Sequence, residues 1–155
     1  MIDKFPSKGE PVMVTREMCD LNNHMNVVYY QYIFENGCHD FYQNMGFTNE
    51  YFNEGYSSFT LEANIRYLKE LREGEKGTPH FRLIKINPKL IHYVGIIVDE
   101  VGGVSSFSEH ILAHVDMNVR RTSEMPDHLM NNLNSMLEQH NTTGPIDFEL
   151  RLKIK

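Results

Sequence analysis

The chain has 155 residues and a net charge of −6 at neutral pH, from 15 Lys and Arg against 21 Asp and Glu. The length suits one domain, and 41% hydrophobic with 23% charged residues excludes a disordered chain or a multi-pass membrane protein. An acidic chain without a Lys/Arg run is not expected to bind nucleic acid, because phosphate neutralisation supplies most of that affinity. At the N-terminus, residues 1–10 contain no apolar signal segment, and no later run is long enough to cross a membrane, so we expect a cytoplasmic protein.

The first third of the chain predicts a strand, a turn and a long helix. Residues 11–18 are β-prone and predict a strand, and the Asx-rich residues 20–26 predict an irregular turn ahead of a helix. From Val27 to Met45 apolar residues recur at three- and four-residue steps, at Tyr30, Phe34, Cys38, Phe41 and Met45. Because this helix is apolar on most sides, we expect it to be buried and to end at Gly46 in the left-handed conformation.

The remaining chain predicts mainly strands. Residues 57–67 alternate apolar and polar side chains, and residues 81–86 and 90–99 form a predicted hairpin. Residues 104–119 would make a strand long enough to need a bulge or bend. Pro126 opens a second predicted helix, and the alternation of residues 146–154 predicts a final strand. One central helix against a curved, mainly antiparallel sheet gives an α+β fold.

The turn before the long helix carries the candidate site. It places the Asp20 carboxylate, the His24 imidazole and the Asn26 carboxamide next to helix N–H groups that can polarise a carbonyl and hold an oxyanion. Asp20 can act as a nucleophile or a general base, and His24 and Asn26 can orient substrate or water. These groups suffice for acyl transfer to water. The same residues could instead only cap the helix, and their spacing leaves both interpretations open.

The pattern Asp20-x-Asn22-x-His24-x-Asn26-x-Val28-x-Tyr30 resembles the signature of hot-dog-fold thioesterases, notably the plant acyl-carrier-protein and the 4-hydroxybenzoyl-CoA thioesterases. The predicted element order also agrees, over about residues 11–126. The resemblance implies a single hot-dog domain over residues 1–155, with an extra helix and strand from about residue 126. It also implies hydrolysis of an acyl-CoA thioester without cofactor or metal, by a homodimer or a dimer of dimers.

The resemblance also implies roles for individual residues. Asp20 matches the catalytic carboxylate, and Val27 matches the position whose backbone N–H polarises the thioester carbonyl. Asn22 and His24 match the Asn and His proposed as catalytic in the plant enzymes. Many bacterial members have Gly where Asn23 stands, and since Asn tolerates positive φ, we expect the turn to be kept.

A narrower resemblance concerns the substrate. Residues 57–68 and 111–116 resemble the betainyl-CoA thioesterase domain that is joined to carnitine dehydrogenase, which would here stand alone. A trimethylammonium group donates no hydrogen bonds, so its pocket would need aromatic faces and nearby negative charge. The candidates for these contacts are the aromatic residues of the first helical turns, Tyr29, Tyr30 and Phe34.

Two other functions stay open on the sequence: a hot-dog hydratase or dehydratase, and a non-catalytic protein that only binds acyl-CoA. A metal site is not predicted. His110, His114 and Asp116 share a strand face, but among eight histidines such pairings arise by chance, and no helical His-x-x-x-His motif occurs.

Overall fold

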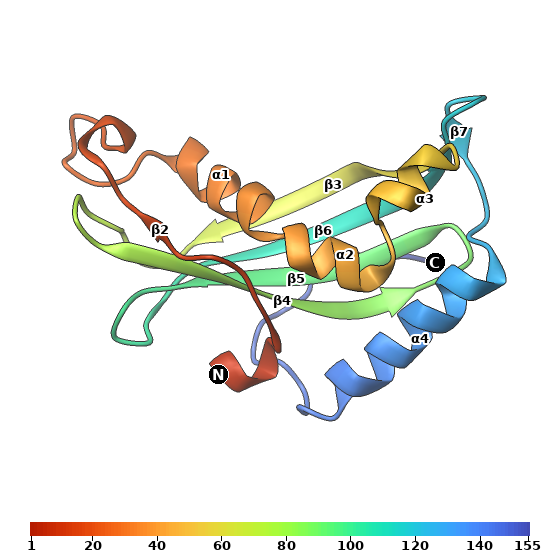
Figure 1. The fold of residues 1–155 in the computed structure, drawn as a ribbon. Coiled ribbons are helices and arrows are strands. Elements are labelled where there is room, and N and C mark those ends of the chain that lie inside the picture. Colours follow the sequence, from red (N-terminus) through yellow and green to blue (C-terminus); the bar gives the residue numbers. More distant parts are fainter.

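The computed structural model describes residues 1–155 and contains one antiparallel sheet with helices along one face (Figure 1). The strands are β1 (Ser7–Lys8), β2 (Val12–Met13), β3 (Tyr56–Tyr67), β4 (Lys76–Ile86), β5 (Leu90–Val98), β6 (Val104–Asp116) and β7 (Arg121–Thr122). The helices are α1 (Val27–Gly37), α2 (His39–Met45), α3 (Asn49–Asn53) and α4 (Asp127–Asn141). None of them has the length and apolar character needed to cross a bilayer.

The sheet runs in the order β1-β4-β5-β6-β3, with β2 also paired to β4 and β7 to β6. Every pair is antiparallel. The four long strands confirm the strands predicted after the helix, although β4 begins at Lys76, five residues before the predicted start. The bulge predicted in the longest strand is Ser105 of β6, since Val98 pairs with Val104 while Ile97 pairs with Ser106. The strand ends at Asp116, three residues before the predicted end, because residues 117–120 form a turn into β7.

The α1–α2 segment lies along the face that we call the inner face of the sheet (Figure 1). Its apolar side chains meet those of β4 and β5 in a 22-residue core, in which Phe41 stacks on Phe81 at 5.3 Å between ring centroids and packs on Tyr93 at the same distance. Burial of this core supplies most of the free energy that holds helix and sheet together. The arrangement is the expected hot-dog fold, a helix wrapped by a curved sheet.

The single helix predicted over residues 27–45 is in fact two helices. Its beginning at Val27 and its end at Gly46, where φ is 110°, are as predicted, but the chain leaves helical geometry at Cys38. At the preceding residue the helix passes so close to β4 that a Cβ on Gly37 would lie 2.2 Å from Cγ of Pro79. The apolar periodicity continues through Cys38, so the sequence pattern does not reveal the break.

The predicted strand at residues 11–18 is also shorter than expected. Within residues 11–18 only Val12–Met13, strand β2, form a ladder, which pairs them with β4. Residues Arg16–Met18 form a 3₁₀ turn. The short helix α3 was not predicted, although Thr48 marks its start by accepting a hydrogen bond from the Tyr51 N–H at 3.2 Å. Helix α4 agrees with the prediction, since Leu129 and Leu133 are buried where it packs on β4 and α2.

The predicted final strand, residues 146–154, is wrong. Residues 142–155, which we call the C-terminal strap, form no ladder with any strand. The strap lies on the outer face of the sheet, opposite α1. Its apolar alternation is real, because Ile146, Phe148 and Leu150 pack against the outer-face core, where Phe148 stacks on Phe107 at 4.3 Å.

Side chains of the sheet satisfy the backbone of the strap in place of a neighbouring strand. The Glu109 carboxylate, fully buried, accepts hydrogen bonds from the N–H groups of Arg151 and Leu152 at 2.9–3.0 Å. Arg66 donates to the carbonyl of Glu149 at 2.7 Å, and Lys85 to that of Ile154 at 3.0 Å. The alternation therefore marks a segment that lies flat on an apolar face rather than one that extends the sheet edge.

Candidate active site

The Asx-rich loop ahead of α1 is closed by its own backbone. Cys19 and Met25 form a β-bridge, and the Asp20 N–H donates to the carbonyl of His24 at 3.1 Å. Asn23 sits at the tip with φ of 61°, which confirms that Asn supports the left-handed turn expected at this position. The loop thus holds Asp20 and His24 at fixed places on either side of a tight turn.

The start of α1 leaves one N–H group free. Asn26 caps the helix, with its side-chain oxygen accepting from the Val28 N–H at 3.2 Å and its carbonyl accepting from the Tyr29 N–H at 3.0 Å. The N–H of Val27, the first helical residue, has no acceptor within the protein. It lies at the positive end of the helix dipole and can donate to a ligand carbonyl.

A pocket of about 280 Å³ opens next to this helix start. Its wall combines residues of the loop, of α1, of the end of β3 and of the segment that follows it: His24, Met25, Val27, Tyr30, Tyr67, Leu68, Lys69 and Glu70. His24 Nδ1 lies 3.2 Å from the carbonyl of Met25, and since a carbonyl only accepts, Nδ1 is the donor and Nε2 has no partner within the protein. Three of the predicted site residues, His24, Val27 and Tyr30, therefore share one pocket.

Tyr30 forms the floor between helix and sheet. Its hydroxyl accepts from the Leu71 N–H at 3.1 Å and donates to the Lys69 carbonyl at 3.3 Å, which fastens the segment after β3 to α1. Burial raises the pKa of this phenol, so it stays protonated in the neutral range. The hydroxyl is fully engaged, and only the ring of Tyr30 faces the pocket.

Other predicted site residues lie outside the pocket wall. Asp20 is half-buried, and its Oδ1 accepts from the Asn22 N–H at 2.8 Å, so the Asn22 backbone orients the carboxylate. Tyr29 points to another side of α1, where its hydroxyl donates to the Glu17 carbonyl at 3.4 Å. Phe34 lies deep in the core, edge-on to Phe81 at 6.3 Å. The structure thus places neither Tyr29 nor Phe34 in this pocket.

Tyr67, which the sequence reasoning missed, does line the pocket. Its ring is 50% exposed and packs edge-on against Tyr30, with ring centroids 5.1 Å apart. In the sequence it ends a run of alternating apolar residues, which indicates only a core position. The signal that could have pointed to it is the charged segment that follows at once, because Lys69 and Glu70 place the end of this strand at the surface.

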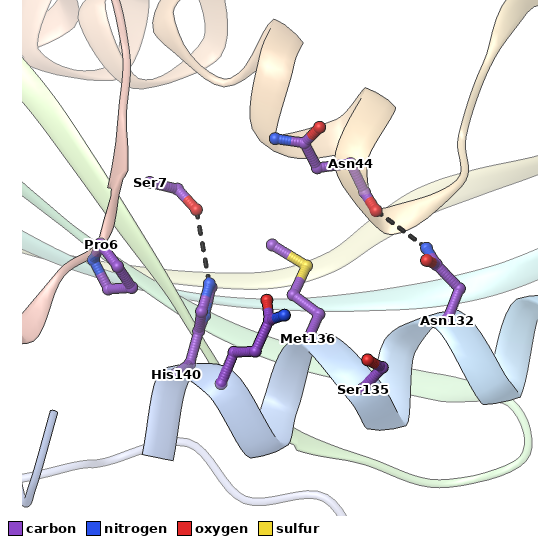
Figure 2. A pocket seen from close by; sticks show the side chains of 8 residues that line it. Pro6, Ser7, Asn44, Asn132, Ser135, Met136 and His140 are labelled. Carbon is purple, nitrogen blue, oxygen red and sulfur yellow. Dashed lines mark hydrogen bonds between the residues drawn. The ribbon is translucent and has the colours of Figure 1, made fainter. Parts of the chain in front are cut away.

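A larger pocket of about 430 Å³ lies elsewhere, between the N-terminal segment, α2 and α4 (Figure 2). His140 faces the Ser7 hydroxyl at 3.5 Å, and Asn132 donates to the Asn44 carbonyl at 2.8 Å (Figure 2). The other ring nitrogen of His140 accepts from the Leu83 N–H at 2.9 Å. Burial lowers the pKa of His140 to about 4 and keeps it neutral. These contacts join α4 to its neighbours, and no residue of the Asx-rich loop reaches this pocket.

Comparison with known proteins decides the family. The model of the thioesterase-like superfamily matches residues 14–133, which cover the loop, both inner helices and all four long strands. The chain belongs to the thioesterase-like superfamily. The observed hot-dog fold and the motif at residues 20–30 both agree with this family. Helix α4 extends beyond the matched region.

Three proteins similar to this superfamily member have informative names. The L-carnitine dehydrogenase/betainyl-CoA thioesterase of Agrobacterium fabrum is 29% identical over 92% of the chain, which spans only 29% of that relative's length. The betainyl-CoA thioesterase of Pseudomonas aeruginosa is 23% identical, over 82% of the chain and 81% of its own length. A Staphylococcus aureus protein solved in complex with CoA superposes with a TM-score of 0.75 at 25% identity, covering 94% of this chain and 92% of that one.

No three His, Cys, Asp or Glu side chains gather into a cluster that could hold a metal ion. His114, one of the residues weighed as a ligand, bonds instead to the Tyr51 hydroxyl at 2.6 Å and to the Ser123 hydroxyl at 3.0 Å.

Proposed function

We propose that this protein hydrolyses an acyl-CoA thioester to the free acid and CoA, with betainyl-CoA as its substrate. The observation that carries the proposal is the free N–H of Val27, at the positive end of α1 and in the same pocket wall as His24. A thioester carbonyl that accepts from this N–H is polarised, and the negative charge that forms when it is attacked meets the end of the helix dipole. The family and the CoA-bound structural relative support a CoA thioester as ligand.

The proposed reaction needs a group that attacks or activates water. The Asp20 carboxylate, oriented by the Asn22 N–H, either adds to the carbonyl itself or takes a proton from the attacking water. The tetrahedral oxyanion then collapses, the C–S bond breaks, and the CoA thiolate leaves and takes up a proton. Attack by water gives the free acid directly, whereas attack by Asp20 leaves the acyl group on its carboxylate as an anhydride, which water then hydrolyses to the free acid and Asp20. His24 Nε2 is the group in the pocket wall that can orient the water or the departing sulfur, while Asn26 is committed to the helix cap.

The acyl group is proposed from the names of two relatives together with the pocket. Both the Agrobacterium fabrum and the Pseudomonas aeruginosa proteins carry betainyl-CoA thioesterase in their names. The pocket beside Val27 is small, and aromatic rings from Tyr30 and Tyr67 form part of its wall. Such a wall suits a compact cation that donates no hydrogen bonds.

A release assay for CoA thiol across a panel of acyl-CoA esters tests the function. Turnover supports a thioesterase, hydration of an enoyl-CoA would indicate a hydratase, and binding without either reaction would indicate a sensor. We expect Asp20→Asn to lower kcat by about 10²–10⁴ with folding intact, since the variant loses the attacking or proton-accepting group. Asp40→Asn, the same change at an exposed position on α2, is the matched control. Unchanged turnover in Asp20→Asn would remove Asp20 from the mechanism.

We further propose that two copies pair through the edge of β3. This strand ends the sheet, so the edge facing away from β6 has unpaired backbone groups along its 12 residues. Leu61, 56% exposed, lies at this edge where a bulge interrupts the pairing with β6. Light scattering should give twice the mass of one chain, and Leu61→Lys should give the single-chain mass. Val101→Lys, in a turn where the side chain is 87% exposed, should leave the dimer intact. A wild-type monomer at micromolar concentration would contradict the pairing.

A further inference from the structure

Tyr67 is unusual among the aromatic residues of the inner face. Those of the core, such as Phe34, Phe41 and Tyr93, are almost fully buried, whereas Tyr67 is half-exposed at the mouth of the pocket beside Val27. Its hydroxyl makes no hydrogen bond within the protein. The ring is therefore not used to hold the fold in the way that its neighbours are.

The position of this ring is nevertheless well defined. Tyr30 lies edge-on to it at 5.1 Å and 72°, and Tyr30 is itself held at its hydroxyl by Lys69 and Leu71. On the strand, the backbone of Tyr67 pairs with Ser106 of β6. A ring fixed in this way loses little side-chain freedom when a ligand meets it, which favours tight recognition.

The charges around the ring suit a positively charged ligand. The ammonium of Lys69, the lysine of the pocket wall, is bonded to the Asp99 carboxylate, so its charge is already balanced. The Glu70 carboxylate is itself ion-paired with Arg72, but both hydrogen bonds go to Oε1, so Oε2 has no donor and can still face a cation. The titratable side chains that line the pocket are those of Lys69, Glu70, His24 and the two tyrosines.

We propose that Tyr67 is the specificity-determining residue for a trimethylammonium acyl group, with its ring facing the cation and Glu70 contributing negative potential from the side. Cation–π attraction requires a ring face within about 6 Å of the cation, and a pocket of about 280 Å³ keeps an acyl group that short near the ring. This inference rests on the proposed thioester hydrolysis and concerns only which acyl group the same pocket prefers.

The experiment compares two substrates of nearly equal shape, betainyl-CoA and 3,3-dimethylbutyryl-CoA, in which carbon replaces the cationic nitrogen. The measured quantity is the ratio of their kcat/KM values. Tyr67→Leu removes the ring and should lower the ratio by about fivefold, because a half-exposed cation–π contact is worth about 1 kcal/mol. Tyr67→Phe keeps a ring face and should keep the ratio within about twofold of the wild type. Glu70→Gln should lower it by about twofold, and Glu73→Gln, beside Arg16, is the charge-matched control.

Each result has a distinct meaning. If Tyr67→Leu slows both substrates by the same factor, the ring only supports the pocket and the inference is wrong. If the wild type hydrolyses the neutral isostere with a kcat/KM equal to or above that for betainyl-CoA, the inference is also wrong. Acyl-CoA hydrolysis then still stands. If the wild type releases thiol from no acyl-CoA at all, the proposed function fails, and the inference fails with it.

Discussion

His110 should make the protein sensitive to mild acid. This residue of β6 is fully buried on the inner face, stacked on Tyr93 at 4.7 Å and 5° between ring planes, and edge-on to Phe34 at 6.2 Å. Neither of its ring nitrogens has a hydrogen-bond partner. Burial, with a smaller effect from His92, lowers its pKa from 6.5 to about 4, so the native state holds the neutral imidazole.

The size of the effect follows from the two pKa values. Above the unfolded pKa of 6.5 the neutral ring is favoured in both states, and His110 adds no pH dependence. Between pH 6.5 and about 4 the unfolded chain binds a proton that the native state does not. The free energy of unfolding therefore falls by about 1.4 kcal/mol for each unit by which the pH is lowered. Over the whole interval the loss amounts to about 3 kcal/mol.

Urea unfolding at several pH values between about 7 and 5 measures this slope. His110→Phe keeps the stacked ring but cannot bind a proton, and its slope should be smaller than that of the wild type by about 1.4 kcal/mol per pH unit. Carboxylates and the other histidines titrate in both proteins, so the difference isolates His110. His39→Asn, at an exposed ring, is the control. Parallel stability curves for wild type and His110→Phe would refute the reasoning.

Two further predictions concern the loop and the strap. Asn23→Gly should preserve kcat, whereas Asn23→Val should cost about 1–2 kcal/mol in unfolding free energy and lower kcat, because a β-branched residue strains the positive φ of a turn that positions Asp20. Thermal melting and thiol release measure the two effects, and an active, fully stable Asn23→Val would contradict the role of the turn. Glu109→Ala should lower the unfolding free energy by about 3 kcal/mol, because it removes the ion-pair partner of the half-buried Arg66 and leaves two strap N–H groups without their acceptor. A change within about 0.5 kcal/mol in urea unfolding would show that Glu109 does not hold the strap.

The sequence predicted those features whose cause is local. An Asn just before an apolar periodic segment is a favoured helix cap, and Asn26 caps α1 in this way. Gly46 ends α2 because glycine adopts positive φ without strain. The loop could be recognised because its residue types and spacing carry the family motif. For the same reason Asn23 could be expected to replace a Gly there.

The features that the sequence did not reveal depend on contacts between distant segments. The break at Cys38 arises where the helix meets Pro79 of β4, and no helical pattern records that contact. Alternation at residues 146–154 indicates one apolar side, but it cannot tell whether that side faces a strand edge or a sheet face. The choice of Tyr67 over Tyr29 and Phe34 as a pocket residue depends on how α1 is rotated against β3, which only the folded chain determines.

The C-terminal strap has a consequence for how copies of this chain can assemble. A second molecule could stack on the outer face only after the strap had left, which would expose Val94, Ile96 and Phe107 and break the bonds to Glu109. At the opposite edge of the sheet, β1, β2 and α4 already occupy β4. The long strand with an uncovered edge is β3, and the two-fold pairing proposed above would use that edge. In that arrangement each molecule joins one partner through β3, and the pair has no open β3 edge left for a third molecule.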